Sequence, residues 1–478
     1  MIEIRIMQKL VFILLITISF VPLSYSQEVN YEFGLHSILS KDTPFWIQSN
    51  EFGKIEGKGI NTIGEFKSNV FYEINSLISI GSELNLVSRI SDKSTFFAPL
   101  ANASIQVGKF QLIGGRFHFG RNQQLEELST GSLTMSQNAV PIPRVMLKSD
   151  YISFPFTSDI LQIKGTFAHG VVDGDRAVSK PFLHESSLYG KLQFSKFNVY
   201  LGLQRYAFWG GRSINPTYGK LPSSLDDFFR IVFSKEGGSN APALDQDYKL
   251  GDQFGNYDGG VNWNTNKYKA EVYWQNFFED KDGLTLKNYT DGLFGVAVKL
   301  KKTLLIDSFV YEHIYSKDQS GPLAADGTRG GPGGQDNYYN HSVYLTGWSY
   351  HQRSVGTPFF TSSKGRATNN FYFENNRVVV HHIGIGGSYN SNFRYSLKIS
   401  TSNNYGNYRD RDYANANGFS YEFSPPKRQT SMVALVVYTP KSDSRFSVLS
   451  KVALDRGSLY PNSFGLQLGV TFKPTNSK

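Results

Sequence analysis

The chain contains no cysteine, and this absence excludes both a disulfide framework and a lipid-modified N-terminal cysteine. Charged residues make up only 19% of the sequence and hydrophobic residues 40%, and the mean hydropathy is −0.32. A soluble enzyme of this size normally carries more charge and fewer aromatic residues. After residue 26, no window holds about 18 uninterrupted apolar residues, so the sequence predicts no transmembrane helix.

Aromatic residues and glycine are abundant instead. The chain has 28 Tyr, 37 Phe and 45 Gly, and aromatic residues make up 15% of it. This composition suits alternating strands whose ends lie in aromatic girdles at the two membrane surfaces. The net charge of +9 favours anionic partners such as acidic glycans, lipopolysaccharide or phospholipid headgroups, although it also serves general solubility. The length allows two or three soluble domains or one large barrel.

The first 26 residues have the pattern of an export signal. Arg5 and Lys9 precede an apolar run from Leu10 to Val21, and small residues follow at Ser24 and Ser26. The run is too short for a comfortable transmembrane helix. We therefore expect residues 1–26 to be removed on export. Residues 27–478 would then form either a secreted protein or an outer-membrane barrel.

Alternation of apolar and polar residues recurs along the chain. In residues 464–472, Leu466, Leu468 and Val470 fall on one face of a strand, and Gln467 and Gly469 fall on the other. Such alternation means that one face meets hydrocarbon or a core while the other meets water. The same pattern appears in residues 82–90, 161–168, 188–195, 199–204, 268–275, 296–301, 395–400 and 432–438.

A row of soluble β-sandwiches would show the same alternation. The export signal, the aromatic content and the lack of a linker between domains favour a single barrel. Short turns are expected at residues 301–303, 389–392 and 440–443, on the periplasmic side, and long outer connections at 316–337 and 403–424. The length has room for roughly 16 to 18 strands. The last strand should close the barrel against the first, near residues 31–39.

Two stretches break the alternation. Residues 122–128, with Leu125 and Leu128 three apart, are typical of a short helix. Residues 223–232 are a stronger helix candidate, because Pro222 and Ser223 supply start signals and acidic residues follow in the first turn. Its expected apolar face must be buried, and a plug or a cap at one mouth of the barrel is the natural place for it. That face comprises Leu225, Phe228, Phe229 and Val232.

Several separated motifs resemble the capsule assembly Wzi family of outer-membrane proteins. None is diagnostic alone, but their order from about residue 33 to residue 472 is much more specific. The motifs are Thr43-Pro44-Phe45-Trp46, Asn50-Glu51-Phe52-Gly53, the run from Gly131 to Arg144, Phe182-Leu183-His184-Glu185, Trp209-Gly210-Gly211, Leu221-Pro222-Ser223-Ser224, Asp336-Asn337-Tyr338-Tyr339-Asn340-His341, Gly347-Trp348-Ser349-Tyr350 and Gly356-Thr357-Pro358-Phe359-Phe360.

The resemblance implies an all-β fold, a transmembrane antiparallel β-barrel of about eighteen strands. It also implies short helices that plug the periplasmic mouth and loops that close the outer mouth. The function implied is that of a surface lectin, which binds capsular or related polysaccharide and helps anchor or assemble it at the cell surface. The family's binding residues are not carried over individually, because the outer loops must differ with each glycan.

Candidate sugar-binding residues follow from the chemistry of sugars. Aromatic rings stack on pyranose faces, while Asn, Asp, Arg and Lys bond hydroxyls and carboxylates. An arginine guanidinium suits the carboxylate of a uronate. The alternative role of such residues is an ordinary aromatic girdle with polar loops. The candidates in residues 337–353 and 403–421 are Tyr338, Tyr339, His341, Trp348, Tyr350, Arg353, Tyr405, Tyr408 and Arg409.

The main alternative is a substrate-selective porin for sugars or anions, with Lys164, Lys191 and Lys299 lining its lumen. We do not expect an enzyme, since neighbouring carboxylates such as Glu126 and Glu127 cannot flank a glycosidic bond. Nucleophile and zinc-protease motifs are also lacking. We expect no cofactor and no catalytic or metal-binding residue. The expected partners are surface polysaccharide and outer-membrane lipid, without nucleic acid, and the expected state is a monomer.

Overall fold

The computed structural model describes most of the chain after residue 26. The predicted export signal and two candidate sugar-binding residues, Tyr408 and Arg409, lie outside the described residues. The described ranges are 27–120, 125–247, 249–279, 281–302, 305–321, 336–362, 373–407 and 422–474.

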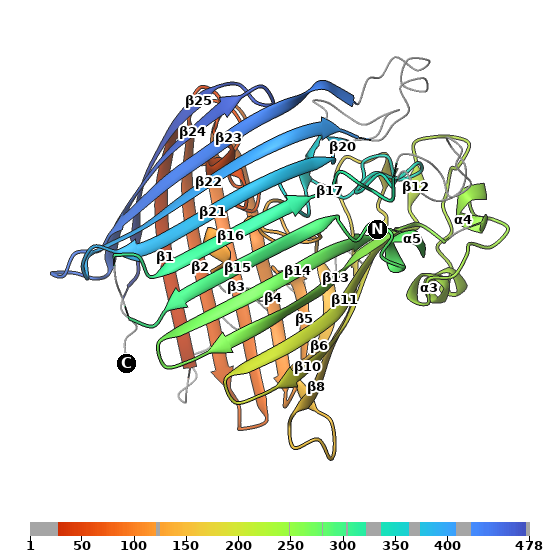
Figure 1. Cartoon of the computed structure of the whole chain (residues 1–478), viewed down its shortest axis with the longest axis horizontal. Coiled ribbons are helices and arrows are strands. Elements are labelled where there is room, and N and C mark those ends of the chain that lie inside the picture. The colour runs from red at the N-terminus through yellow and green to blue at the C-terminus, as the bar shows by residue number, and fades with distance from the viewer. Residues whose placement is uncertain are drawn as a thin grey trace.

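Eighteen long antiparallel strands close into one barrel (Figure 1). Each strand pairs with its neighbours in chain order, and β25 returns to β1, where Leu468 lies opposite Ser37. The predicted barrel and its closure are therefore confirmed. The strands of the circuit are β1 (Gln27–Leu39), β2 (Asn61–Glu73), β3 (Ile78–Ile90), β4 (Thr95–Val107), β5 (Phe110–Arg116), β6 (Arg144–Ser149), β8 (Leu161–Val171), β10 (Phe182–Gln193), β11 (Phe197–Trp209), β13 (Asp252–Asn264), β14 (Tyr268–Phe278), β15 (Gly292–Leu300), β16 (Ser308–Tyr315), β21 (Val378–Ser388), β22 (Phe393–Gly406), β23 (Glu422–Tyr438), β24 (Phe446–Gly457) and β25 (Ser463–Phe472).

Shorter elements lie in the connections between these strands. The short strands are β7 (Ile152–Ser153), which pairs with β8, and three two-stranded ribbons: β9 (Val178–Ser179) with β12 (Arg212–Ser213), β17 (Ser349–Tyr350) with β18 (Arg353–Ser354), and β19 (Thr361–Ser362) with β20 (Phe373–Asn375). The helices are α2 (Phe45–Gln48), the 3-10 helix η1 (Glu126–Leu128), α3 (Leu225–Val232), α4 (Ala243–Asp247) and α5 (Lys281–Leu284). None of the helices in the described ranges is long and apolar enough to cross a bilayer.

The wall shows the alternation that the sequence predicts. On β25, Leu468 is 48% exposed on the outside of the barrel, whereas Gln467 is 5% exposed on the inside. The outward side chains are apolar because they meet hydrocarbon, and the inward ones meet the lumen. The predicted outer and inner faces of this strand are therefore correct.

The two ends of the barrel differ in the length of their connections. At one end, β2–β3, β4–β5, β10–β11, β13–β14 and β21–β22 are joined by tight turns, and β25 ends there. Bacterial barrels place their longer loops outside, so we name the other end the outer mouth and this end the inner mouth.

The predicted side of the helical plug is wrong. Every helix in the described ranges lies in a connection at the outer mouth, away from the C-terminal end of β25 (Figure 1). Chain length accounts for much of this, because the five tight turns at the inner mouth are too short for a helix, whereas every helix in the described ranges lies in a longer connection. Two strand bounds also differ from the prediction. β16 begins at Ser308, later than the turn expected at residues 301–303 implies, and Asn403 to Tyr405 belong to β22 rather than to a loop.

Candidate functional site

The connection between β5 and β6 folds into the lumen instead of staying at the rim. Glu312 of β16 accepts hydrogen bonds from the Thr130 amide at 2.6 Å and from the Ser129 hydroxyl at 2.7 Å. Gln275 of β14 accepts one from the Leu133 amide at 2.9 Å. A buried chain segment needs partners for its backbone polar groups, and here inward-facing polar side chains of the wall supply them.

A chain of hydrogen bonds ties η1 to the wall. The Leu128 carbonyl can only accept, so Nε2 of His382 donates to it at 2.7 Å. Nδ1 of His382 then accepts from the Ser400 hydroxyl at 2.7 Å, and Ser400 accepts from Nε1 of Trp46 at 3.0 Å. A side chain at Gly384 would collide with the Leu128 carbonyl, so glycine is needed where η1 lies against β21.

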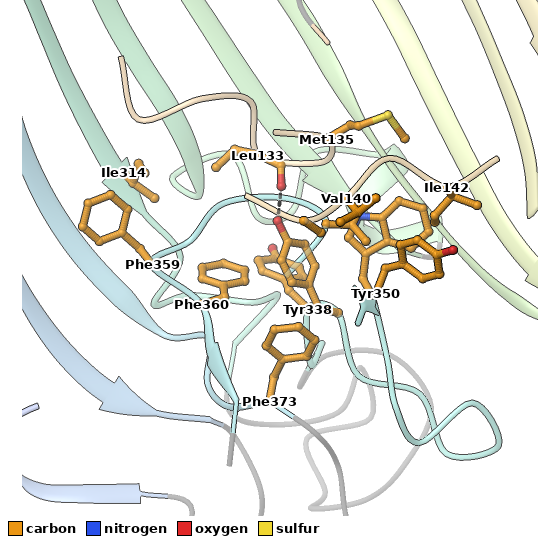
Figure 2. Close-up of a cluster of buried hydrophobic side chains, with 14 of the residues drawn as sticks. Leu133, Met135, Val140, Ile142, Ile314, Tyr338, Tyr350, Phe359, Phe360 and Phe373 are labelled. Carbon is orange, nitrogen blue, oxygen red and sulfur yellow. Dashed lines mark hydrogen bonds between the residues drawn. The ribbon is translucent and has the colours of Figure 1, made fainter. Parts of the chain in front are cut away.

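The connection between β16 and β21 packs onto this inserted segment. Nε1 of Trp348 donates to the Thr134 carbonyl at 2.5 Å, the Tyr339 hydroxyl donates to the Leu133 carbonyl, and the Ser136 hydroxyl donates to the Gly356 carbonyl at 2.6 Å. Figure 2 shows the side chains of Phe359, Phe360 and Phe373 gathered on one side of the segment that carries Leu133. Residues more than 200 positions apart are thus held together.

Aromatic contacts run across the lumen from one wall to the other. The ring centroid of Phe45 in α2 lies 4.9 Å from that of Phe359, and the ring centroid of Phe360 lies 4.7 Å from that of Tyr339. On the far side, Trp348 lies 4.6 Å from Phe254 of β13 and 4.7 Å from Phe208 of β11. We call the buried rings that the connections supply the aromatic plug. It comprises Phe45, Trp46, Tyr338, Tyr339, Trp348, Tyr350, Phe359, Phe360 and Phe373.

Four of the predicted sugar-binding aromatic residues belong to this plug. Tyr338, Trp348 and Tyr350 have no exposed surface, and Tyr339 is 2% exposed. Their rings have no face available to a sugar in this arrangement. The sequence pattern correctly gathered them in one connection, but a local pattern cannot separate a ring that covers a surface from a ring that fills a core.

The other described candidates keep some exposed surface. His341 is half-buried, and its Nδ1 accepts from the Val343 amide at 3.1 Å. Arg353 is also half-buried, and its guanidinium donates to the backbone carbonyls of Gln48, at 3.2 Å, and of Ile55. Arg353 therefore ties two outer connections together. Tyr405 is half-buried at the outer end of β22, with the ammonium of Lys317 4.6 Å above its ring.

A polar cluster at the outer mouth was not foreseen from the sequence. The Arg116 guanidinium lies 3.2 Å from the Tyr350 hydroxyl and 3.7 Å from the Asp173 carboxylate. The Tyr350 hydroxyl donates to Asp173, and Nε2 of His351 lies 3.8 Å from the same carboxylate. We call Arg116, Asp173, Tyr350 and His351 the mouth cluster. Arg116 ends β5, Asp173 follows β8, and Tyr350 and His351 belong to the connection between β16 and β21, so no local spacing could have revealed the cluster.

Two members of the mouth cluster, Asp173 and His351, are open to water. The Asp173 side chain is 53% exposed and that of His351 is 45% exposed. Burial holds the pKa of His351 below its usual range, although Asp173 opposes this shift, so the ring is neutral at pH 7. It offers one donor and one acceptor. His351 and Gln352 form the two-residue turn between β17 and β18 with φ of 46° and 62°, a left-handed conformation that glycine normally takes.

The three lysines of the alternative porin hypothesis differ in their surroundings. Lys164 and Lys191 lie over the ring of Tyr151 at 4.9 Å and 3.9 Å. Lys164 pairs across the sheet with Tyr189, whose hydroxyl donates to Asp258 at 2.9 Å, on the lumen side of the wall. Lys299 instead donates to Asp307 at 2.6 Å and is neutralised by it.

Two acidic residues outside the mouth cluster, Asp226 and Asp291, have structural partners. Asp226 lies 2.7 Å from Arg230 on α3. The Asp291 carboxylate, 1% exposed, accepts from the Tyr338 hydroxyl and from the Gln319 amide, both at 2.7 Å, and burial raises its pKa to about 6. Within the described ranges, no group of three or more His, Asp or Glu side chains is placed to hold a metal ion.

One protein family matches well over half of the chain. The family described as "Capsule assembly protein Wzi" matches residues 41–381. No curated protein matches the sequence. Among solved structures, OpdO of Pseudomonas aeruginosa is similar at 10% identity, with a TM-score of 0.48 over 94% of this chain and 98% of that one. OpdL of the same organism is similar at 8% identity, with a TM-score of 0.46 over 94% and 99%.

Proposed function

The chain belongs to the Wzi family of capsule assembly proteins, and from this premise we propose that it binds capsular or related polysaccharide at its outer mouth and retains it there. The family and the barrel place the protein in the outer membrane, with a role in capsule assembly. Both also suggest a non-enzymatic protein. We propose in addition that the protein binds the polymer directly and that it does so as a monomer.

The observation that carries the proposal is the aromatic plug. Its rings reach from α2 to β11 and β13, so the long connections are packed from below by a core. A binding surface held in this way loses little conformational entropy when a ligand arrives. A lumen filled with packed side chains also suits a surface receptor better than a channel for solutes.

The mouth cluster supplies the chemistry that a glycan needs. The Asp173 carboxylate accepts bonds from neighbouring sugar hydroxyls, the neutral His351 ring both donates and accepts, and Arg116 favours a carboxylate such as that of a uronate. Tyr405 with Lys317 provides a second contact of aromatic face and positive charge. We also retain Tyr408, Arg409 and His341 as proposed contacts. Arg353 is better explained as a structural tie.

Retention would come from many weak contacts. A long polysaccharide offers repeated copies of the same sugar unit, so one polysaccharide molecule can bind several protein molecules at once. Each contact is weak, but an effective concentration in the millimolar range raises the overall affinity by orders of magnitude. Non-covalent attachment of this kind needs no catalytic group.

Two measurements on the purified protein test the proposal and separate it from the porin alternative. The first is pull-down of capsular polysaccharide, for which we expect binding that weakens as salt rises. The second is single-channel recording in planar bilayers, for which we expect no ion-conducting steps. Open steps together with no polysaccharide binding would overturn the proposal in favour of a porin.

A further inference from the structure

The helix α3 lies on the outside of the barrel wall, not in its lumen. On β10, His184 shares a face with Leu188, which is 64% exposed on the lipid side, whereas Glu185 points inward and pairs with Arg144 at 3.0 Å. Phe228 of α3 packs against His184 and His169 on this outward face, with ring centroids 6.3 Å and 5.4 Å apart. The prediction that this helix plugs a mouth is therefore wrong.

The helix covers polar side chains that would otherwise face lipid. The Arg205 guanidinium of β11 donates to the Val232 carbonyl at 3.0 Å and to the Ile231 carbonyl, at the C-terminal end of α3. His184 has no exposed surface beneath the helix. On another part of the wall, His381 also points outward near the outer end of its strand, but it is exposed, since no helix in the described residues covers it.

The start of α3 is fixed by its sequence. The Ser224 hydroxyl accepts from the Asp227 amide at 3.2 Å, while the Asp227 carboxylate accepts from the Ser224 amide at 2.8 Å. This capping box stabilises the first turn of the helix. The cap is Ser224, one residue later than the predicted start. The orientation of the helix at the rim is fixed by Phe228 and Ile231, whose side chains pack against the wall.

A third face of α3 is apolar and exposed. Leu225, Phe229 and Phe233 are spaced four apart and are 72%, 50% and 66% exposed. Next to them on the helix are the charged residues Asp226 and Arg230, which pair at 2.7 Å. One helix thus has a face for the wall, a face for water and a face for an apolar partner.

We propose that α3 is an interfacial helix, with Leu225, Phe229 and Phe233 inserted among the acyl chains of the outer leaflet. The apolar face continues the lipid-facing surface of the barrel below it, where Phe167 is 41%, Leu188 64% and Leu201 59% exposed. Phe167 lies 6.5 Å from Phe228, so the helix joins this surface directly. Amphipathic helices with this division of faces lie at the boundary between headgroups and acyl chains.

The inserted helix extends the apolar exterior on one side of the barrel only. Over β8 and β10 the helix covers the wall at His169 and His184, whereas over β16 and β21 no helix in the described residues covers His313 and His381. An anchor on one side of the barrel biases the tilt of the barrel relative to the leaflet. This inference requires the outer-membrane location but not the binding of polysaccharide.

The cysteine-free chain allows a direct test, because one substitution gives one label site. Phe229→Cys carries a nitroxide label on the exposed apolar face. Leu188→Cys is the lipid-facing reference and Asp226→Cys the water-facing reference, one turn or less from position 229. Each labelled protein is placed in phospholipid vesicles, and collisions with oxygen, which enters hydrocarbon, are compared with collisions with a water-soluble nickel chelate.

We expect the label at position 229 to match the one at 188. It should collide with oxygen several-fold more often, and with nickel several-fold less often, than the label at 226. A label at 229 that behaves like the one at 226 would overturn the proposal. A label shielded from both reagents would also overturn it, because a protein partner would then cover the face.

Discussion

The wall of the barrel and the aromatic plug both gather aromatic and apolar side chains, but different surroundings hold them. On the wall, Phe33 and Leu468 are 48% exposed on the lipid side, so the membrane completes their environment. In the plug, Trp348 and Tyr338 are fully buried, and each makes hydrogen bonds to a distant part of the chain. The outward side chains of the wall are stabilised by contact with lipid, whereas the side chains of the plug are stabilised by contacts within the protein.

This contrast indicates which part of the molecule can hold a ligand-binding site. The wall repeats one pattern around the membrane, so its side chains carry little that is specific to a ligand. The plug fixes connections of irregular sequence, and these bring Arg116, Asp173 and His351 together at the outer mouth. Binding and catalytic residues are commonly found on loops held by a rigid scaffold.

The largest expected effect comes from emptying the plug. Trp348→Ala should lower the free energy of unfolding by about 3–5 kcal/mol, because it removes a buried ring and leaves a cavity. Phe33→Ala on the wall should cost at most about 2 kcal/mol, since acyl chains fill the vacated space. Chemical denaturation in lipid vesicles measures both. Equal costs would remove the distinction between plug and wall.

A charge placed on the lipid face should have the next largest effect. Leu468→Arg should cost about 2–4 kcal/mol if position 468 lies near the middle of the bilayer. Asn69→Arg is the matched control, because Asn69 is exposed on the lumen side beside Glu83 and Glu28. If the lumen substitution destabilises the barrel as much as the lipid-facing one, the assignment of faces is contradicted.

A smaller effect should appear as a pH dependence confined to the outer connections. Burial raises the pKa of Asp291 to about 6, above the ordinary value of 3.8, so the folded mouth holds this proton more tightly than the unfolded chain does. Its contribution to stability is present below about pH 4 and is lost as the pH rises through 6. Hydrogen-exchange protection around Tyr338 should therefore be higher at pH 5 than at pH 7.5.

Asp291→Asn provides the control for this pH dependence. The variant has no carboxyl group at position 291, so protection around Tyr338 should become nearly independent of pH over the same range. A dependence that survives the substitution would assign the effect to another group.

The smallest effect on stability should accompany the largest effect on binding. Asp173→Asn together with His351→Ala alters exposed side chains, so the free energy of unfolding should change by less than about 1 kcal/mol. Polysaccharide pull-down should nevertheless fall several-fold. Lys441→Ala, in an inner turn, should change neither quantity. Loss of binding without loss of stability would sharpen the contrast between a structural plug and a binding surface.

The barrel could be predicted from the sequence because its signal is local. Alternation in residues 464–472 or 161–168 reports directly which side chains meet hydrocarbon, and the tight turns mark the inner mouth. The helix over residues 223–232 was also found, since its cap and acidic first turn lie within a few residues of each other. Its place on the outer wall was not found, because that depends on Arg205 and His184 in other strands.

The candidate site was predicted only in part, because its contacts are long-range. Trp348 meets Thr134 across 214 positions and Tyr350 meets Asp173 across 177, and no spacing in the sequence reports such pairs. Aromatic residues in the connection between β16 and β21 were expected to contact sugar, but their burial in the plug could not be foreseen. Asp173 carried no local signal, and nothing in residues 337–353 indicated that His351 would lie beside it.

Capsule retention on living cells tests the central claim most directly. A deletion strain is complemented with the wild-type chain, with the Asp173→Asn, His351→Ala variant, or with Lys441→Ala, and cell-bound polysaccharide is scored against released polysaccharide at matched levels of folded protein. We predict that the wild type and Lys441→Ala retain capsule, whereas the double variant releases most of it. Full retention by the double variant would contradict binding at the mouth cluster, and full retention by the deletion strain would contradict the proposed function.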